Sequence, residues 1–389
     1  MISPGPSILQ LAEFVNGYPF KPDQLGTEGL PVVRIRQLVD PSAEVDYADP
    51  PSNAVYIDDG DLVFAWSGSL EVRLWSRGRA LLNQHLFRVD PYTGIERRWL
   101  RYVLEVGTDR LAPLMHGSAM THVTRDMLRL LKVDVPSLIT QQRIADFLDA
   151  ETARIDALIE KKRRMMGLVS EQTEARVELE LRAAANRHGE TPLKHMAREV
   201  TVGIVVTPAQ WYAEDGVPAL RGINVVPGRV RLDDLVFLTA AGHALHPKSR
   251  LANGDLVTVR SGQAGATAVV PEELHGANCV DLLITRPRTC VSAAYLEAVM
   301  NSDWCRKHVA KHSVGAIQSH FNVEALKGLP VPSLPSDEQE ALAYRLREAR
   351  RKAERLVMTL ERQIDLLMEH RQALITAAVT GELDLAEAA

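Results

Sequence analysis

One short motif occurs twice in this chain and divides it into two similar halves. The sequence Val-Pro-Ser-Leu begins at Val135 and again at Val331, and a run with helical apolar periodicity follows each copy. Residues of the first run are matched 198 positions later: Gln141, Ile144, Ala145 and Leu148 by Gln339, Leu342, Ala343 and Leu346. Since sequence self-similarity is the mark of a repeated structural unit, we expect two related units.

The stretches ahead of the two runs correspond more weakly. Both contain a glycine and a proline at similar places, a Gly-X-Pro triplet followed by arginine, a Gly-Asp-Leu-Val segment followed by Ser-Gly, and a segment that runs from glycine to histidine. These matched segments begin at Gly17, Gly29, Gly60 and Gly117 in the first half and at Gly203, Gly216, Gly254 and Gly315 in the second. The order predicted is therefore globular domain, long helix, globular domain, long helix.

The fold class predicted is α+β. In each globular half, short β-rich runs such as residues 54–57 and 255–259 alternate with Gly, Pro and Asp turns, which is typical of a mixed α/β domain. The domains are expected at 1–138 and 188–335, the helices at 139–187 and 336–380, and a tail at 381–389. The fold is thus two pseudo-repeated domains joined by two long antiparallel coiled-coil helices.

The helices are predicted from an apolar seam with steps of three and four residues. An apolar seam is usually structural, and two helices of similar length separated by a domain most simply pack antiparallel and set the distance between the domains. At about 1.5 Å per residue, about 43 residues span about 65 Å. The seam comprises Ile144, Leu148, Ile155, Ile159, Met166 and Val169 in the first helix and Leu342, Leu346, Leu356, Leu360, Ile364, Leu367 and Leu374 in the second.

The charge distribution argues against a large basic surface. The formal net charge is −5, and the basic runs at 161–164 and 350–352 are short. Such runs are usually solvated helix faces, although they could contact phosphates. The sequence has no apolar stretch long enough to span a bilayer and no basic region ahead of an apolar run at its start, so we expect a cytoplasmic protein.

Segments of both helices resemble the specificity subunits of type I restriction-modification systems, and the resemblance covers nearly the whole chain. Residues 141–149 with Thr152, Ile155, Asp156 and Ile159 look like the central conserved region of that family, and residues 379–382 look like the end of its distal one. In both halves a proline-containing strand precedes the glutamine that leads the helix. One departure is Thr140, which stands where the family has an acidic residue, as Glu338 does in the second copy.

This resemblance implies a non-catalytic DNA-binding protein of bacterial defence. Its two domains would be target recognition domains that each read one half of a split, asymmetric sequence in double-stranded DNA. The helices would set the unread spacer and dock two modification (methyltransferase) subunits, with restriction (nuclease and translocase) subunits as further partners. This chain would bind no cofactor, whereas the partners would use S-adenosylmethionine, and ATP and Mg²⁺ for restriction. In agreement, the sequence has no phosphate-binding glycine motif and no metal-site spacing of histidines.

Base reading needs donors and acceptors on loops, and three matched sets of residues are candidates. Any single one of these residues could instead be turn chemistry or part of a salt bridge, so the sets carry the prediction. In the first domain they are Arg34, Arg36, Ser67, Ser69, Arg73, Ser118, Thr121 and His122. In the second they are Arg221 and Asn224, which are matched with Arg34 and Arg36, together with Arg260, Ser261, Gln263, Gln318, Ser319 and His320.

Two other functions remain open from the sequence. A coiled-coil scaffold that binds only proteins would explain the seams, but it explains poorly why two diverged domains carry matched Gly-Ser-Arg loops. A nuclease would need an acidic cluster, for which Asp58-Asp59-Gly60-Asp61 is the best candidate. That cluster has no comparable counterpart in the second half, and turn residues entering a strand are the more ordinary explanation.

Overall fold

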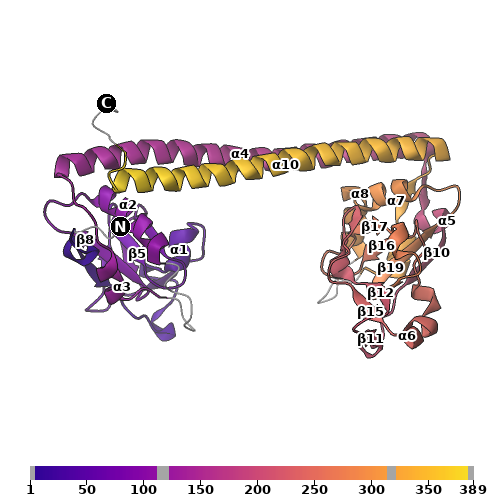
Figure 1. Ribbon diagram of the computed structural model, residues 1–389, viewed down its shortest axis with the longest axis horizontal. Coiled ribbons are helices and arrows are strands. Elements are labelled where there is room, and N and C mark those ends of the chain that lie inside the picture. The colour runs from indigo at the N-terminus through magenta and orange to yellow at the C-terminus, as the bar shows by residue number, and fades with distance from the viewer. Residues whose placement is uncertain (1–4, 112–121, 313–320, 384–389) are drawn as a thin grey trace. The chain divides into compact units, whose positions relative to one another are not determined.

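The computed structural model describes residues 5–111, 122–312 and 321–383 (Figure 1). It divides into two compact units: unit 1 comprises Met1–Lys162 and Arg362–Ala389, and unit 2 comprises Arg163–Glu361. Two helices, α4 (Leu138–His188) and α10 (Ser336–Val379), belong partly to each unit. The unit boundaries therefore fall inside the two long helices and not where the domains meet them.

Among its described residues, unit 1 contains two four-stranded sheets and three shorter α-helices. The first sheet has the order β1-β8-β5-β6 and is antiparallel throughout; the second has the order β3-β2-β7-β4, in which β2 and β7 are parallel. The strands are β1 (Ala12–Asn16), β2 (Leu30–Val33), β3 (Asp46–Ala48), β4 (Tyr56–Ile57), β5 (Leu62–Ala65), β6 (Glu71–Leu74), β7 (Ala80–Leu82) and β8 (Leu86–Pro91). The helices are α1 (Ile35–Val39), α2 (Arg97–Leu111) and α3 (Arg125–Leu130).

Unit 2 repeats this plan. Its sheets have the orders β10-β19-β16-β17 and β11-β15-β12-β18, and β12 and β18 are again parallel. The strands are β9 (Glu190–Pro192), β10 (Ala197–Val202), β11 (Tyr212–Ala213), β12 (Val217–Leu220), β13 (Val225–Val226), β14 (Arg229–Val230), β15 (Val236–Leu238), β16 (Leu256–Val259), β17 (Thr267–Val269), β18 (Asn278–Cys279), β19 (Leu282–Pro287) and β20 (Pro330–Pro332). The helices are α5 (Leu193–Met196), α6 (Ala240–Leu245), α7 (Ala293–Met300), α8 (Asp303–His312) and α9 (Val323–Lys327).

The repeat read in the sequence is a structural repeat. Strands β1, β8, β5 and β6 of unit 1 correspond to β10, β19, β16 and β17 of unit 2, in the same order. Gly17 and Gly203 follow β1 and β10, and a Cβ on either would lie only 2.2 or 2.4 Å from a backbone oxygen, of Asn83 or Cys279. Glycine is required at both positions because two backbone segments approach each other there.

The main core of each unit lies between a sheet and the long helices. In unit 1, Phe64 of β5 and Trp99 of α2 share a buried cluster with Leu148 of α4 and Ile375 of α10. In unit 2, Leu256 of β16 and Tyr295 of α7 share one with Val177 of α4 and Leu346 of α10. Since each core contains parts of both long helices, each unit includes its own segment of the antiparallel coiled coil (Figure 1).

Polar contacts reinforce the helix pair within each unit. In unit 1, Arg371 of α10 pairs with Asp156 of α4 at 3.2 Å and with Glu105 of α2 at 2.5 Å. In unit 2, Glu174 of α4 pairs with Arg350 of α10 at 3.5 Å and with Arg306 of α8 at 3.3 Å. The antiparallel coiled coil predicted from the seams is therefore present.

One seam residue departs from the prediction. Most seam positions are buried or half-buried, but Leu356 is 42% exposed, while the neighbouring Val357 is half-buried. From Ala353, steps of three then four lead through Leu356 to Leu360, and steps of four then three lead through Val357. Both routes satisfy the periodicity, so the sequence could not distinguish them.

The glutamines that lead the two long helices attach them to the domains. Gln141 is 1% exposed; its Oε1 accepts from the Glu96 N–H at 2.8 Å, and its Nε2 donates to the carbonyls of Gly94 at 3.1 Å and Pro136 at 2.9 Å. Gln339 is 3% exposed; it accepts from the Ser292 N–H and donates to the Leu334 carbonyl, each at 2.9 Å. The repeated glutamine is thus explained by the backbone groups that it satisfies.

Candidate nucleic-acid interface

The three candidate loop sets adjoin one another in the first domain. Ser67 and His122 form an isolated β-bridge, and the Val123 N–H donates to the Trp66 carbonyl at 2.7 Å. A Cβ on Gly68 would lie 3.9 Å from Cδ1 of Ile35, the residue between Arg34 and Arg36. Residues from distant parts of the sequence therefore meet at the end of β5. Ser118 and Thr121 lie outside the described residues.

The second domain brings the corresponding segments together. The Phe321 N–H donates to the Arg260 carbonyl at 3.0 Å, as Val123 does to Trp66. A Cβ on Gly222, which follows Arg221, would lie 3.7 Å from Val259 Cγ1. Three further candidates, Gln318, Ser319 and His320, lie outside the described residues.

The candidate side chains differ in how accessible they are. Arg36, Ser69, Arg73, His122, Ser261 and Gln263 are exposed, whereas Arg34, Ser67, Arg221 and Arg260 are half-buried. Several are already in ion pairs: Arg34 and Arg36 with Asp46, at 2.8 and 3.4 Å, and Arg73 with Glu71 at 2.9 Å. Exposed pairs of this kind are weak, so these arginines could exchange their carboxylate for a phosphate.

Asn224 is a capping residue and not a surface group. It is 1% exposed; its Oδ1 accepts from the Arg221 N–H at 2.9 Å, and its Nδ2 donates to the Asp233 carbonyl at 2.8 Å. The residue that plays this part in the first domain is Gln37, whose Oε1 accepts from the Arg34 N–H at 3.0 Å. The structural counterpart of Asn224 is therefore Gln37 and not Arg36, and the match drawn from the sequence is one residue out.

The candidate His122 belongs to an aromatic cluster at the end of β5 whose other members, Trp66 and His85, were not among the candidates. Trp66 Nε1 donates to Asn16 Oδ1 at 3.2 Å and to the Gln84 carbonyl at 3.1 Å. The Trp66 ring lies 5.6 Å from the His85 ring and 6.1 Å from the His122 ring, centroid to centroid. A cavity of about 360 Å³ opens beside it, lined by Asn16, Trp66, Phe87, His122, Val123, Thr124 and Arg125. Trp66 directly precedes the Ser67-Gly68 pair in the sequence, and this position could have identified it as a candidate site residue.

The equivalent place in the second domain holds an ion pair. Arg260 Nη1 donates to Asp281 Oδ1 at 2.6 Å, and Arg260 Nε donates to the Phe321 carbonyl at 3.4 Å. Asp281 has a φ of 49°, in the left-handed region. Asp281 was not predicted as a site residue, because nothing in the sequence indicates that it pairs with Arg260.

The acidic cluster proposed for a nuclease is a turn. Asp61 Oδ2 accepts from the Asp58 N–H at 2.8 Å, and Asp59 Oδ1 accepts from the Gly78 N–H at 2.6 Å. Arg79 pairs with Asp58 at 3.0 Å, and this contact holds the pKa of the Asp58 carboxyl below its usual range. Within the described part of the chain, no group of His, Cys, Asp and Glu is arranged to hold a metal ion.

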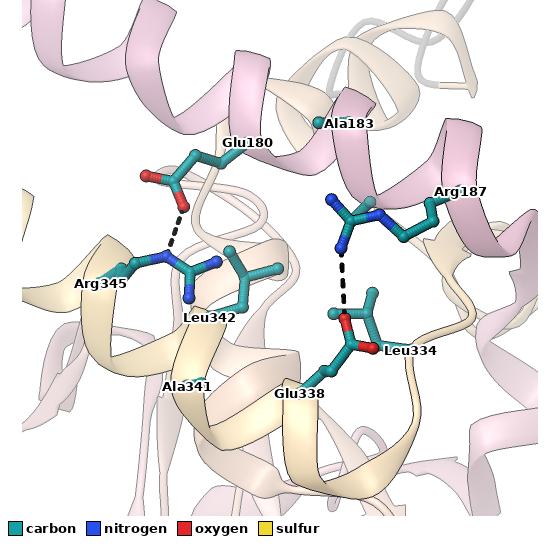
Figure 2. Close-up of a pocket in the computed structure, with 9 residues that line it drawn as sticks. Glu180, Ala183, Arg187, Leu334, Glu338, Ala341, Leu342 and Arg345 are labelled. Atoms are coloured by element: carbon teal, nitrogen blue, oxygen red, sulfur yellow. Dashed lines mark hydrogen bonds and ion pairs between the residues drawn. The ribbon is translucent and has the colours of Figure 1, made fainter.

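A second cavity lies between α4 and α10 in unit 2 (Figure 2). It has a volume of about 330 Å³ and is flanked by the ion pairs Glu180–Arg345, at 2.9 Å, and Arg187–Glu338, at 3.6 Å. Figure 2 shows these side chains pointing toward one another, with Leu342 between them. Because the charged groups satisfy each other, the arrangement holds the two helices together and presents no reactive group.

The basic runs on the helices also make intramolecular contacts. Lys162 Nζ donates to Gln363 Oε1 at 2.6 Å in unit 1. In unit 2, Arg350 donates to the carbonyls of Ala298 at 3.2 Å and Asn301 at 3.0 Å, which attaches α10 to α7. Among the described residues, no helix is both long enough and apolar enough to cross a membrane.

Comparison with known proteins identifies the domain. Residues 10–164 match the family model described as Type I restriction modification DNA specificity domain. The chain is 19% identical to the type I restriction enzyme EcoBI specificity subunit of Escherichia coli, over 97% of this chain and 85% of that protein. It is 18% identical to the MjaVIII specificity subunit of Methanocaldococcus jannaschii, over 85% of this chain and 80% of that protein.

Solved structures agree with the fold. A chain from a structural study of complex assembly and conformational transition of the type I R-M system superposes with a TM-score of 0.70, at 17% identity, covering 98% of this chain and all of that one. The HsdS subunit from Thermoanaerobacter tengcongensis gives a TM-score of 0.50 at 17% identity, covering 98% of both chains. Residues 10–164 are therefore a type I restriction modification DNA specificity domain, and over nearly its whole length the chain is similar to the specificity subunits of type I restriction enzymes.

Proposed function

We propose that this chain recognises a split, asymmetric DNA sequence, with one half-site read by each domain. The observation that carries the proposal is the duplicated domain, in which the sheets repeat while the side chains at the loop junctions differ. Trp66 stands at the end of β5, and Arg260 stands at the corresponding end of β16. Two identical readers would favour a symmetric target, whereas one scaffold with two different sets of side chains fits an asymmetric one.

The weakly held arginines at the loops would supply phosphate contacts. Arg34, Arg36 and Arg73 are held only by ion pairs that are partly open to solvent, so a phosphate can replace the carboxylate at low cost. The net charge of −5 implies that much of the remaining phosphate binding falls to partners. Phosphate contacts would fix the position on DNA, and the loop side chains would read the bases.

We further propose that the long helices bind two modification subunits, with restriction subunits joining that complex. Large apolar side chains are exposed on the helix segments of each unit: Leu158, Leu366 and Met368 in unit 1, and Met165, Leu168 and Met358 in unit 2. Exposed apolar side chains on a surface mark places where a partner can exclude water. S-adenosylmethionine, ATP and Mg²⁺ would then be bound by those partners and not by this chain, and a complex that acts on chromosomal DNA would work in the cytoplasm.

Deleting the gene in its native host tests the proposal. Adenine methylation would be compared with the parent strain across the genome by single-molecule sequencing, with reintroduction of the gene as control. We expect one split, asymmetric methylated motif to disappear on deletion and to return on complementation. An unchanged methylome in a strain whose modification subunits are expressed would contradict the proposal and favour a protein-binding scaffold.

A further inference from the structure

The strand register places one pair of residues at the same point in both domains. Ala65 of β5 lies opposite Leu86 of β8, and Val259 of β16 lies opposite Leu282 of β19. The next residues outward are Trp66 and His85 in the first domain and Arg260 and Asp281 in the second. The two domains therefore carry different chemistry at one equivalent point, which adjoins the candidate loops in each.

In the second domain this point presents an oriented guanidinium. Arg260 donates one N–H from Nη1 to Asp281 and one from Nε to the Phe321 carbonyl. A guanidinium has five N–H donors in a fixed plane, so about three remain, on Nη1 and Nη2. Two donors side by side match the O6 and N7 acceptors of guanine in the major groove. The Asp281 side chain is 43% exposed and that of Arg260 is 18% exposed, so Asp281 lies at the surface and Arg260 is half-buried beside it.

The backbone of Asp281 supports a role beyond packing. Its φ of 49° puts it among three non-glycine residues with positive φ in the described part of the chain, together with Thr207 and Asp234. A non-glycine residue in this conformation carries strain, and such strain tends to occur where a side chain must be held in one place. The Asp281 N–H donates to the Ile204 carbonyl at 2.9 Å, which fixes the turn.

The first domain offers no such group at this point. Trp66 has a single N–H donor, and it is shared between Asn16 and Gln84. His85 Nδ1 lies 3.1 Å from Ser67 Oγ and its Nε2 lies 3.4 Å from Gln84 Nε2, so both ring nitrogens already have a hydrogen-bond partner. Neither side chain has two parallel donors, so neither can make the paired contact with guanine.

Resting on the proposed function, we infer that Arg260 reads a guanine in the half-site of the second domain and that Asp281 is its positioning residue. The first domain reads its half-site with no arginine–guanine contact at the equivalent point. This difference contributes to the asymmetry of the target.

The test uses the full chain expressed in its own host from the native locus, and the readout is the methylated motif. The variants are Arg260→Gln, Asp281→Asn and, as a matched control, Arg129→Gln, because Arg129 also pairs with an aspartate, Asp126, but lies on α3 of the first domain. For Arg260→Gln we expect a roughly tenfold loss of preference for guanine at one position of one half-site, with some gain of adenine, because glutamine matches adenine. Asp281→Asn should change the same position by a smaller factor. The other half-site, the spacer and the control should match the parent.

The outcomes separate the inference from the proposed function. If both half-sites keep their bases in Arg260→Gln, the inference is wrong while the function stands. If Arg260→Gln and Asp281→Asn both lose methylation at every site, the pair supports the fold and does not read a base, which also overturns the inference. If deletion of the gene removes no motif, the proposed function itself fails.

Discussion

The junctions between domain and helix are alike in the two halves of the molecule, whereas the loop surfaces are not. Gln141 and Gln339 both satisfy backbone groups at a helix start. Tyr102 donates its hydroxyl to Asp149 within α4, and Tyr295 donates its hydroxyl to the Pro332 carbonyl just before α10. By contrast, the ends of β5 and β16 carry tryptophan and arginine. The repeat therefore keeps the chemistry that attaches each domain to the helices and varies the chemistry at the loops for which we propose DNA reading.

The largest change should come from altering what the two halves share, the helix pair. Removing seven matched residues from α4 and from α10 takes out nearly two whole turns, so the helical phase is nearly kept while each helix shortens by about 10 Å. At about 3.4 Å per base pair, the unread spacer should shrink by about three base pairs, with both half-sites unchanged. Methylome sequencing measures this. An altered half-site with a constant spacer would refute the role of the helices as a spacer.

The next largest effect, a loss of stability, is expected when Gln141 or Gln339 is replaced. Gln141→Ala leaves an N–H and two carbonyls without their partner and should lower the free energy of unfolding of unit 1 by about 3 kcal/mol. Gln339→Ala, with one N–H and one carbonyl affected, should cost unit 2 about 2 kcal/mol. Urea unfolding monitored in each unit measures the difference. Gln172→Ala, at an exposed position of α4, serves as control, and equal effects in all three variants would contradict the assignment.

Replacing the buried tyrosines should lower the free energy of unfolding by less than replacing the glutamines does. Tyr102→Phe removes bonds to Asp149 at 2.7 Å and Thr152 at 3.1 Å and should cost about 1 to 2 kcal/mol. Tyr295→Phe removes one bond, to the Pro332 carbonyl, and should cost about 1 kcal/mol. Thermal unfolding at pH 7 tests the order of the two, and a larger loss for Tyr295→Phe would contradict it.

The raised pKa of Tyr102 predicts that the folded protein loses stability at alkaline pH. Burial raises the pKa of Tyr102 to about 12. In the unfolded chain a tyrosine releases its proton near pH 10, so between about pH 10 and 12 the unfolded state gains a stabilisation that the native state lacks. The contribution of Tyr102 is therefore complete below pH 10 and is lost as the pH rises to 12. Tyr102→Phe should flatten this part of the stability profile, and an unchanged slope would contradict the explanation.

The smallest effect is expected from a loop arginine. Arg36→Gln removes a weak, exposed pair with Asp46 and should leave the unfolding midpoint unchanged. If Arg36 contacts a phosphate, DNA affinity should fall equally for all sequences, and the slope of log affinity against log salt should become shallower by about one. A change in base preference would instead make Arg36 a reading residue.

Sequence periodicity was sufficient for the repeat, the long helices and the mixed domains. These features depend on local patterns, namely apolar steps of three and four and turn residues at matched places. Leu356 shows the limit, since two apolar neighbours fit the same periodicity and only packing chooses between them. The structure brings the candidate segments of each domain together, but the sequence did not show which side chains within them are accessible.

What the sequence could not supply was pairing across the fold. Asn224 is a residue type that can read bases, yet it caps a turn: its Oδ1 accepts from the Arg221 N–H three residues earlier, and its Nδ2 donates to the Asp233 carbonyl nine residues later. The partnership of Arg260 with Asp281 depends on the register of β16 and β19. Trp66 and His85 meet for the same reason. These two cross-strand pairs follow from tertiary structure and leave no local signature in the sequence.

The composition of unit 1 has a consequence for how the protein is made. Its core contains Ile8 and Leu11 together with Ile375 and Val379, which the ribosome adds more than 350 residues later. Unit 2, by contrast, is one continuous segment, Arg163–Glu361, that is complete before the last residues of unit 1 are synthesised. During translation unit 2 can therefore finish folding first, while the earlier-made domain keeps an apolar surface exposed until residues 362–383 arrive to cover it.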